Sequence, residues 1–111
     1  MNIIKEKEDS VLILKLIGRL DAATIGELKD CVRQNVNEKT VNFVIDLAEV
    51  DFVDSSGLGG LVASLRTVNK EGGEMKISTL RPDVRSIFEL TRLHRLFEIF
   101  DDSSSAANSF S

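Results

Sequence analysis

A polar segment joins a strand-like run to a helix-like run near the middle of the chain, and this junction constrains the fold more than any other feature. The run Val41–Leu47 alternates and is rich in β-branched and aromatic residues, which is typical of a strand. After the segment Asp54-Ser55-Ser56-Gly57-Leu58-Gly59, apolar residues recur with helical spacing at Leu58, Leu61, Val62, Leu65 and Val68. We therefore expect Ser55 to be exposed, at or just before the start of a helix that begins near Gly57.

The start of a helix leaves backbone N–H groups unpaired and carries a positive partial charge. A serine at this position can cap the helix through its hydroxyl oxygen, or it can carry a phosphate that the helix end tolerates. Both roles are open for Ser55 on these grounds alone. For Ser56, a capping or packing hydroxyl is the simpler interpretation.

The remaining hydrophobic patterns alternate between strands and helices. Thr24-Ile25-Gly26-Glu27 has the form of a capping box at the start of the first helix, and Pro82 suits the first turn of the third. Strands are predicted over residues 3–7, 11–17, 41–47, 75–80 and 96–100, and helices over 25–36, 58–68 and 82–93. A short last helix that carries Ala106, Ala107 and Phe110 is an option after the cap-like Asp102-Ser103. The order β-β-α-β-α-β-α-β(-α) predicts an α/β fold with a mixed, mostly parallel sheet and covering helices.

Length and charge limit the class of protein. The chain has 111 residues, which fits a single domain over residues 1–111, and its formal net charge is -4 with a pI near 5.0. An acidic chain is not expected to bind nucleic acid or an anionic membrane surface. No apolar run reaches the length of a membrane span, and the N-terminus lacks the pattern of a signal peptide, so we expect a cytoplasmic protein. The single cysteine, Cys31, is expected to pack as a small residue on a partly buried helix flank.

The residues do not favour catalysis. A serine nucleophile at Ser55 or Ser56 needs an activating base, and the one histidine, His94, lies far away in sequence. Neither a G-x-S-x-G elbow nor a phosphate-binding loop with its lysine is present. Gly57, Gly59 and Gly60 are better interpreted as sites of close backbone approach. We expect no enzyme activity, no cofactor and no metal site.

The chain resembles the STAS domain over essentially its whole length, and within that family it is similar to the bacterial anti-sigma factor antagonists of sporulation and the general stress response. Three stretches carry the resemblance: Gly18-Arg19-Leu20-Asp21 before the first helix; the strand Val44-Ile45-Asp46-Leu47 through Val50-Asp51-Phe52-Val53; and Asp54-Ser55-Ser56-Gly57-Leu58-Gly59, with Gly72-Gly73-Glu74-Met75 as the later turn. Arg19 stands where many relatives carry an acid, so the identity of the partner can differ.

The resemblance implies a phosphorylation switch. In the family, the first serine of the motif is phosphorylated by the anti-sigma factor, a serine kinase with a histidine-kinase-like ATP site, and a PP2C-type phosphatase removes the phosphate. The unphosphorylated antagonist binds the anti-sigma factor and frees the sigma factor. By this resemblance Ser55 is the phosphoacceptor, with Ser56 as second choice, and the partner-binding residues are Asp21, Asp54, Ser55, Ser56, Gly57, Leu58 and Gly59.

Two alternatives accompany this interpretation. Asp21 can instead serve only to stabilise the first helix electrostatically. The chain as a whole can be a non-phosphorylated STAS subunit of a transporter or of a stressosome-like complex. The free protein is expected to be a monomer or a weak dimer.

Overall fold

The computed structural model describes residues 1–110; Ser111, the last residue of the expected domain, lies outside the described part. The strands are β1 (Asn2–Glu8), β2 (Val11–Leu20), β3 (Asn42–Val53), β4 (Glu74–Ser78) and β5 (Ile99–Phe100). The helices are α1 (Ile25–Asn37), α2 (Ser55–Lys70), α3 (Pro82–Leu90) and α4 (Ser103–Asn108), with a short 3-10 turn at Leu93–Arg95. The predicted order of elements is confirmed, including the optional closing helix.

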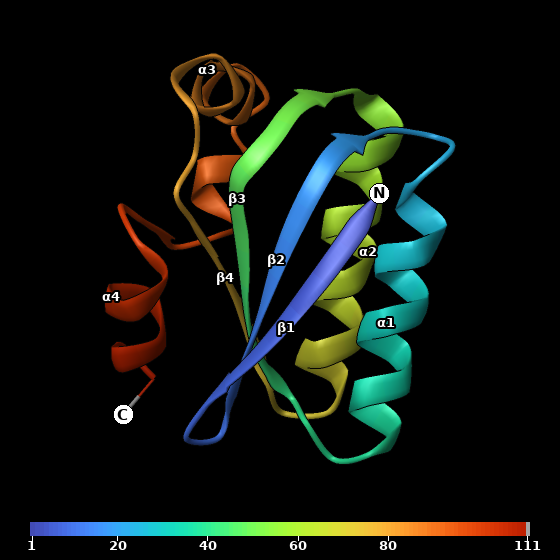
Figure 1. Ribbon diagram of the computed structural model, residues 1–111, viewed down its shortest axis with the longest axis vertical. Helices are drawn as coiled ribbons and strands as arrows, with labels where there is room; N and C mark the ends of the chain where they lie inside the picture. The colour runs from blue at the N-terminus through green and yellow to red at the C-terminus, as the bar shows by residue number, and fades with distance from the viewer. Residues whose placement is uncertain (111) are drawn as a thin grey trace.

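The strands form one sheet in the order β1-β2-β3-β4-β5. β1 pairs antiparallel with β2, and the other three pairings are parallel, so the predicted mixed and mostly parallel sheet is confirmed. Figure 1 shows α1 and α2 side by side along one face of the sheet and α4 against the other. The C-terminal ends of β2 and β3 lead directly into the loops before α1 and α2, which places both helix starts at one end of the molecule.

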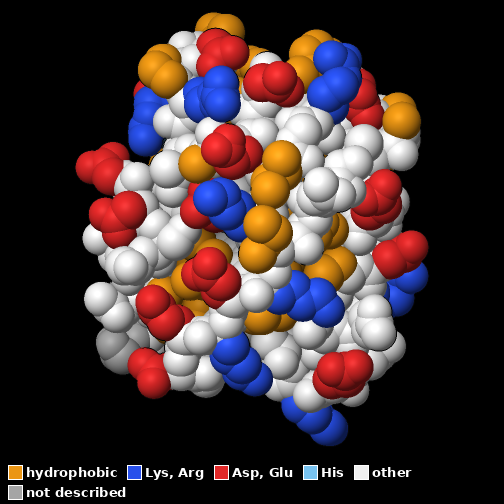
Figure 2. Space-filling view, viewed as in Figure 1, with side chains coloured by type: hydrophobic (Ala, Val, Ile, Leu, Met, Phe, Trp, Pro, Cys, Tyr) orange, Lys and Arg blue, Asp and Glu red, His pale blue; other side chains and the backbone are white. Residues whose placement is uncertain are grey.

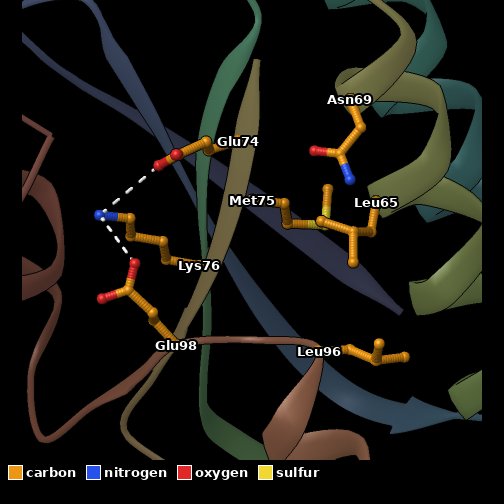
Figure 3. A pocket seen from close by; sticks show the side chains of 7 residues that line it. All are labelled: Leu65, Asn69, Glu74, Met75, Lys76, Leu96 and Glu98. Atoms are coloured by element: carbon orange, nitrogen blue, oxygen red, sulfur yellow. Dashed lines mark ion pairs between the residues drawn. The ribbon is translucent and has the colours of Figure 1, made fainter. Parts of the chain in front are cut away.

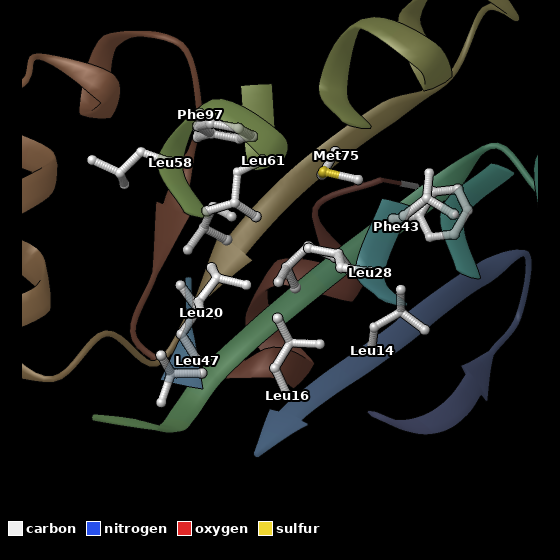
Figure 4. Close-up of a cluster of buried hydrophobic side chains, with 14 of the residues drawn as sticks. Leu14, Leu16, Leu20, Leu28, Phe43, Leu47, Leu58, Leu61, Met75 and Phe97 are labelled. Carbon is white, nitrogen blue, oxygen red and sulfur yellow. The ribbon is translucent and has the colours of Figure 1, made fainter. Parts of the chain in front are cut away.

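The main hydrophobic core lies between the sheet and the helices α1 and α2. Figure 4 shows its leucines interdigitating with aromatic and thioether side chains. Leu14, Leu16, Phe43 and Ile45 are fully buried from the sheet, because residues at every second position of a strand share one face. This core fixes the strand ends from which the two loops emerge.

The opposite face of the sheet is covered only in part. A small second cluster forms where Ala106 and Ala107 of α4 pack on Val11, Ile13 and Val44. Figure 2 looks toward the β1 edge of the sheet, where acidic and basic side chains are interspersed and apolar side chains gather near the centre. Ile4 of β1 remains 45% exposed.

β2 and β3 are longer than predicted. The residue patterns ended them at Ile17 and Leu47, whereas the family resemblance carried the third strand to Val53. The two strands continue side by side until Leu20 pairs with Val53. Two shifts of register, between Lys15 and Ile17 and between Gly18 and Arg19, take up the extra residues of β3. Pairing with β2 therefore extends β3 through residues 48–53, where acidic and apolar residues alternate.

β5 is shorter than predicted. Only Ile99 and Phe100 pair with β4, whereas the expectation began this strand at Leu96. Arg92 adopts a left-handed backbone conformation, with φ of 62°, and the chain then turns through Leu93–Arg95 so that Phe97 enters the core. Burial of Phe97 is better satisfied by this turn than by an extended strand. α4 begins at Ser103, as the cap-like Asp102-Ser103 predicted, and Asp102 caps it by accepting a hydrogen bond from the Ser105 N–H at 2.7 Å.

Candidate functional site: the start of helix α2

Asp54 is the N-cap of α2, and Ser55 is the first residue of the helix. Asp54 has an extended backbone, and its Oδ1 accepts a hydrogen bond from the Gly57 N–H at 2.9 Å. The alternative in which Ser55 caps the helix is therefore wrong. The expected position of Ser55 at the helix start is confirmed, although the helix begins two residues before Gly57.

Both serine hydroxyls are exposed and unengaged. Ser55 and Ser56 are exposed residues, and within residues 1–110 neither side chain forms a hydrogen bond. No base within the described chain therefore activates either hydroxyl as a nucleophile. A partner reaches them without displacing an intramolecular contact.

The two loops at this end are joined through Leu20. The Asp54 N–H donates to the Leu20 carbonyl at 3.2 Å, and a Cβ on Gly57 would overlap the same carbonyl oxygen. A Cβ on Gly60 would likewise overlap the side chain of Ile25, so the predicted close approach is confirmed at Gly57 and Gly60. The prediction is wrong for Gly59, which faces open space, while Leu58 is buried in the core beneath the turn.

Asp21 organises the loop before α1. Its carboxylate accepts hydrogen bonds from the Ala23 N–H at 3.0 Å and from Arg19 Nε at 3.1 Å. The Arg19 hydrogen bond is the largest cause of a lowered pKa at Asp21, and the Ala23 and Thr24 hydrogen bonds lower it further. Asp21 therefore stays ionised and has a clear local role; the contact with a partner that the sequence predicted for it stays a prediction.

The capping box predicted at Thr24 and Glu27 does not form. Thr24 has a helical backbone, with φ of -110° and ψ of -21°, and its side chain makes no cap hydrogen bond. Its hydroxyl instead donates to the Arg19 carbonyl at 2.7 Å and accepts from the Asp21 N–H at 3.0 Å. The Thr24 hydroxyl therefore ties the loop to the end of β2 through Arg19 and Asp21, and it does not cap α1.

Arg19 and Phe52 form a pair that sequence reasoning missed as part of the site. They are opposite each other on β2 and β3, and the guanidinium carbon of Arg19 lies 3.9 Å from the centre of the Phe52 ring. The Arg19 side chain is 58% exposed and Phe52 is 39% exposed. An outward aromatic immediately before the buried Val53 was the available signal, since adjacent strand residues face opposite sides.

The hollow drawn in Figure 3 lies elsewhere, at the edge of the sheet beside β4 and β5, with a volume of about 180 Å³. Lys76 at its rim lies 3.7 Å from Glu74 and 3.5 Å from Glu98, as the dashed lines show. Its lining contains none of the residues at the start of α2. Cys31 is half-buried on α1, as predicted, and burial raises its pKa.

No group of three or more His, Cys, Asp or Glu side chains in residues 1–110 is arranged to hold a metal ion. Among the helices described, none is both long and apolar enough to cross a membrane.

The fold and the exposed serine turn define a known class of regulatory domain. The STAS domain family model matches residues 2–106, and the chain belongs to this family. The chain is 31% identical over 111 residues to the anti-sigma F factor antagonist of Paenibacillus polymyxa, an alignment that covers 96% of this chain and 92% of the relative.

Solved structures agree with this assignment. The protein TM1081 of Thermotoga maritima superimposes with a TM-score of 0.90 at 25% identity, covering 96% of this chain and 92% of that one. An anti-sigma factor antagonist from Mycobacterium paratuberculosis gives a TM-score of 0.86 at 27% identity, covering 97% and 92%. STAS anti-sigma factor antagonists are regulatory proteins rather than enzymes.

Proposed function

We propose that this chain is a phosphorylatable antagonist of an anti-sigma factor and acts in the cytoplasm as a single domain. Unphosphorylated, it binds the anti-sigma factor, which then releases its sigma factor. The anti-sigma factor is itself the serine kinase that phosphorylates Ser55, and a PP2C-type phosphatase reverses the modification. The observation that carries the proposal is an exposed and unengaged Ser55 in the first turn of a helix, directly after its cap, in a chain of this family.

The site is suited to acquiring a phosphate without losing its structure. A phosphoserine carries a charge of about -1.5 to -2 at neutral pH, and the helix start favours negative charge. The Ser55 hydroxyl makes no hydrogen bond in the described chain that the modification would break. The helix itself stays capped by Asp54 rather than by the modified residue.

The change in binding then arises at the interface. The unmodified turn presents Ser55 and Ser56 beside Asp54 and Asp21, a surface that already carries negative charge. A phosphate there adds repulsion against these acids and against the nucleotide phosphates bound to the kinase, and it must lose its hydration on docking. Release of the partner follows without a change in fold.

The test is phosphorylation in vitro by the kinase that co-purifies with the protein from native cytoplasm. Wild type, Ser55→Ala and Ser56→Ala are incubated with this kinase and ATP and analysed by intact mass. Wild type and Ser56→Ala are expected to gain one phosphate, whereas Ser55→Ala gains none and still binds. Phosphate on Ser55→Ala but not on Ser56→Ala would move the site to Ser56. If no protein phosphorylates or binds any form, the non-phosphorylated STAS subunit of a larger complex is the better assignment.

A further inference from the structure

We propose that Arg19, held on the ring of Phe52, is a specificity-determining contact of this chain, where it receives a side-chain carboxylate of the anti-sigma factor. The inference rests on the proposed function, because it names how the partner of that same surface is recognised. It starts from the two contacts of the Arg19 guanidinium: its Nε donates to Asp21 at 3.1 Å, and its carbon lies 3.9 Å from the centre of the Phe52 ring.

Arg19 lies within the area that a partner covering Ser55 must cover. Its carbonyl is tied to the loop before α1 by the Thr24 hydroxyl at 2.7 Å. The next residue, Leu20, accepts the hydrogen bond from the Asp54 N–H that anchors the turn of Ser55. A standard protein interface buries about 800 Å² on each partner, which extends well beyond the one residue, Val53, that separates Phe52 from Asp54.

The Arg19 guanidinium is held in place but still has hydrogen-bond donors without an acceptor. Only Nε has a hydrogen-bond partner in the described chain, so the two terminal nitrogens keep their N–H donors free. Asp21 and the Phe52 ring hold the plane of the group, which reduces the rotamer freedom that binding would otherwise remove. A planar fork with free terminal donors matches a carboxylate, which accepts two parallel hydrogen bonds.

The surrounding charges make this position distinctive. The stretches 18–24 and 49–57 carry four acids and one base; the acids are Asp21, Glu49, Asp51 and Asp54, and the base is Arg19. A partner attracted to the surface formed by these two stretches is basic overall. Within these stretches, Arg19 is the one side chain that attracts an acidic residue of the partner and repels a basic one. A charged interface distinguishes a correct partner from a similar wrong one by such contacts.

The experiment uses the anti-sigma factor captured by the Ser55→Ala protein and then purified. Its affinity for the antagonist is measured by calorimetry without nucleotide, for wild type, Arg19→Gln, Arg19→Lys and Phe52→Leu. Arg33→Gln is the matched control, because Arg33 on α1 is 61% exposed and is also paired with an aspartate, Asp30, at 3.1 Å. Circular dichroism melting confirms that each variant is folded.

We expect Arg19→Gln to weaken binding about tenfold or more, Arg19→Lys and Phe52→Leu to weaken it severalfold, and Arg33→Gln to change it less than twofold. Arg19→Glu should be rescued by changing one acidic residue of the factor to arginine, which a scan of its acids identifies. Wild-type affinity of Arg19→Gln overturns the inference while leaving the proposed function intact. If Arg19→Gln weakens binding only when the titration is repeated with ATP, the guanidinium contacts a nucleotide phosphate and the assignment to a carboxylate is overturned. If no anti-sigma factor is captured, the proposed function fails first.

Discussion

The ammonium group of Lys76 lies 4.3 Å from the centre of the Phe110 ring, beneath the end of helix α4. The Lys76 side chain is 6% exposed, and its Nζ also donates to the Ser109 hydroxyl at 2.7 Å. A lysine this buried requires partners. Residues 109 and 110 supply two of them, beside the carboxylates of Glu74 and Glu98, so Lys76 joins the C-terminal segment to the sheet.

A double-mutant cycle between Lys76 and Phe110 should show a favourable coupling of about 1 to 2 kcal/mol, because the cation and the ring meet away from water. The variants are Lys76→Met, Phe110→Leu and both together, and urea unfolding gives the free energies. Phe100 is the control, since its ring centre is 5.7 Å from the same ammonium and should couple more weakly. Equal coupling for the two rings would contradict the assignment.

Two glycines of α2 should respond oppositely to alanine. Gly59→Ala should raise the free energy of unfolding by up to about 1 kcal/mol, because its Cβ would face open space and alanine favours a helix. Gly57→Ala should lower it by about 2 kcal/mol or more, because the new Cβ would overlap the Leu20 carbonyl. Urea unfolding followed by circular dichroism makes the comparison, and a stabilising Gly57→Ala would show that the two loops are not in contact.

The pKa of Asp21 should depend on Arg19. The folded pKa of this carboxyl is lowered from 3.8, chiefly by the Arg19 hydrogen bond, so the stabilisation that it contributes is present above its unfolded pKa and is lost as the pH falls through the folded value. Arg19→Gln should raise the pKa of Asp21 toward 3.8. The pH range over which acid removes the stabilisation from Asp21 should become narrower. Carboxyl NMR titration of both proteins measures the shift. An unchanged pKa would mean that the hydrogen bonds from Ala23 and Thr24 are enough to lower the pKa of Asp21 without Arg19.

Phosphorylation of Ser55 should leave the melting temperature nearly unchanged. The phosphate would be added at the positive end of α2, whose cap, Asp54, is a different residue. Thermal melting of the phosphorylated and unmodified forms should differ by only a few degrees. A fall beyond about 10 °C, more than a change of 1 to 2 kcal/mol produces in a domain of this size, would indicate that the switch unfolds part of the protein.

Local sequence patterns predicted the order of elements and the position of Ser55, because helical and strand periodicities are strong here and alternate along the chain. They offered a serine as the cap, whereas the cap is Asp54, since aspartate and serine are nearly equal at that position. The capping box predicted at Thr24 and Glu27 was wrong for a related reason. The sequence pattern is present, but the Thr24 hydroxyl donates to the Arg19 carbonyl instead.

Pairings distant in sequence account for the other differences. Phe52 becomes a surface aromatic under an arginine only because β3 runs beside β2 as far as Val53. The shortening of β5 depends on where Phe97 can be buried, which periodicity does not reveal. Both depend on tertiary contacts rather than local preference.

The edge strand β1 alternates so that Lys5 and Lys7 face one side of the sheet while Glu6 and Glu8 face the other. Two copies that joined antiparallel at this edge, about a two-fold axis perpendicular to the sheet, would place residues of the same face opposite each other. Wherever the charged halves, residues 5–8, overlapped, lysine would oppose lysine and glutamate would oppose glutamate. Like charges therefore oppose each other at the edge where sheets most readily extend, which disfavours the joining of two copies through β1.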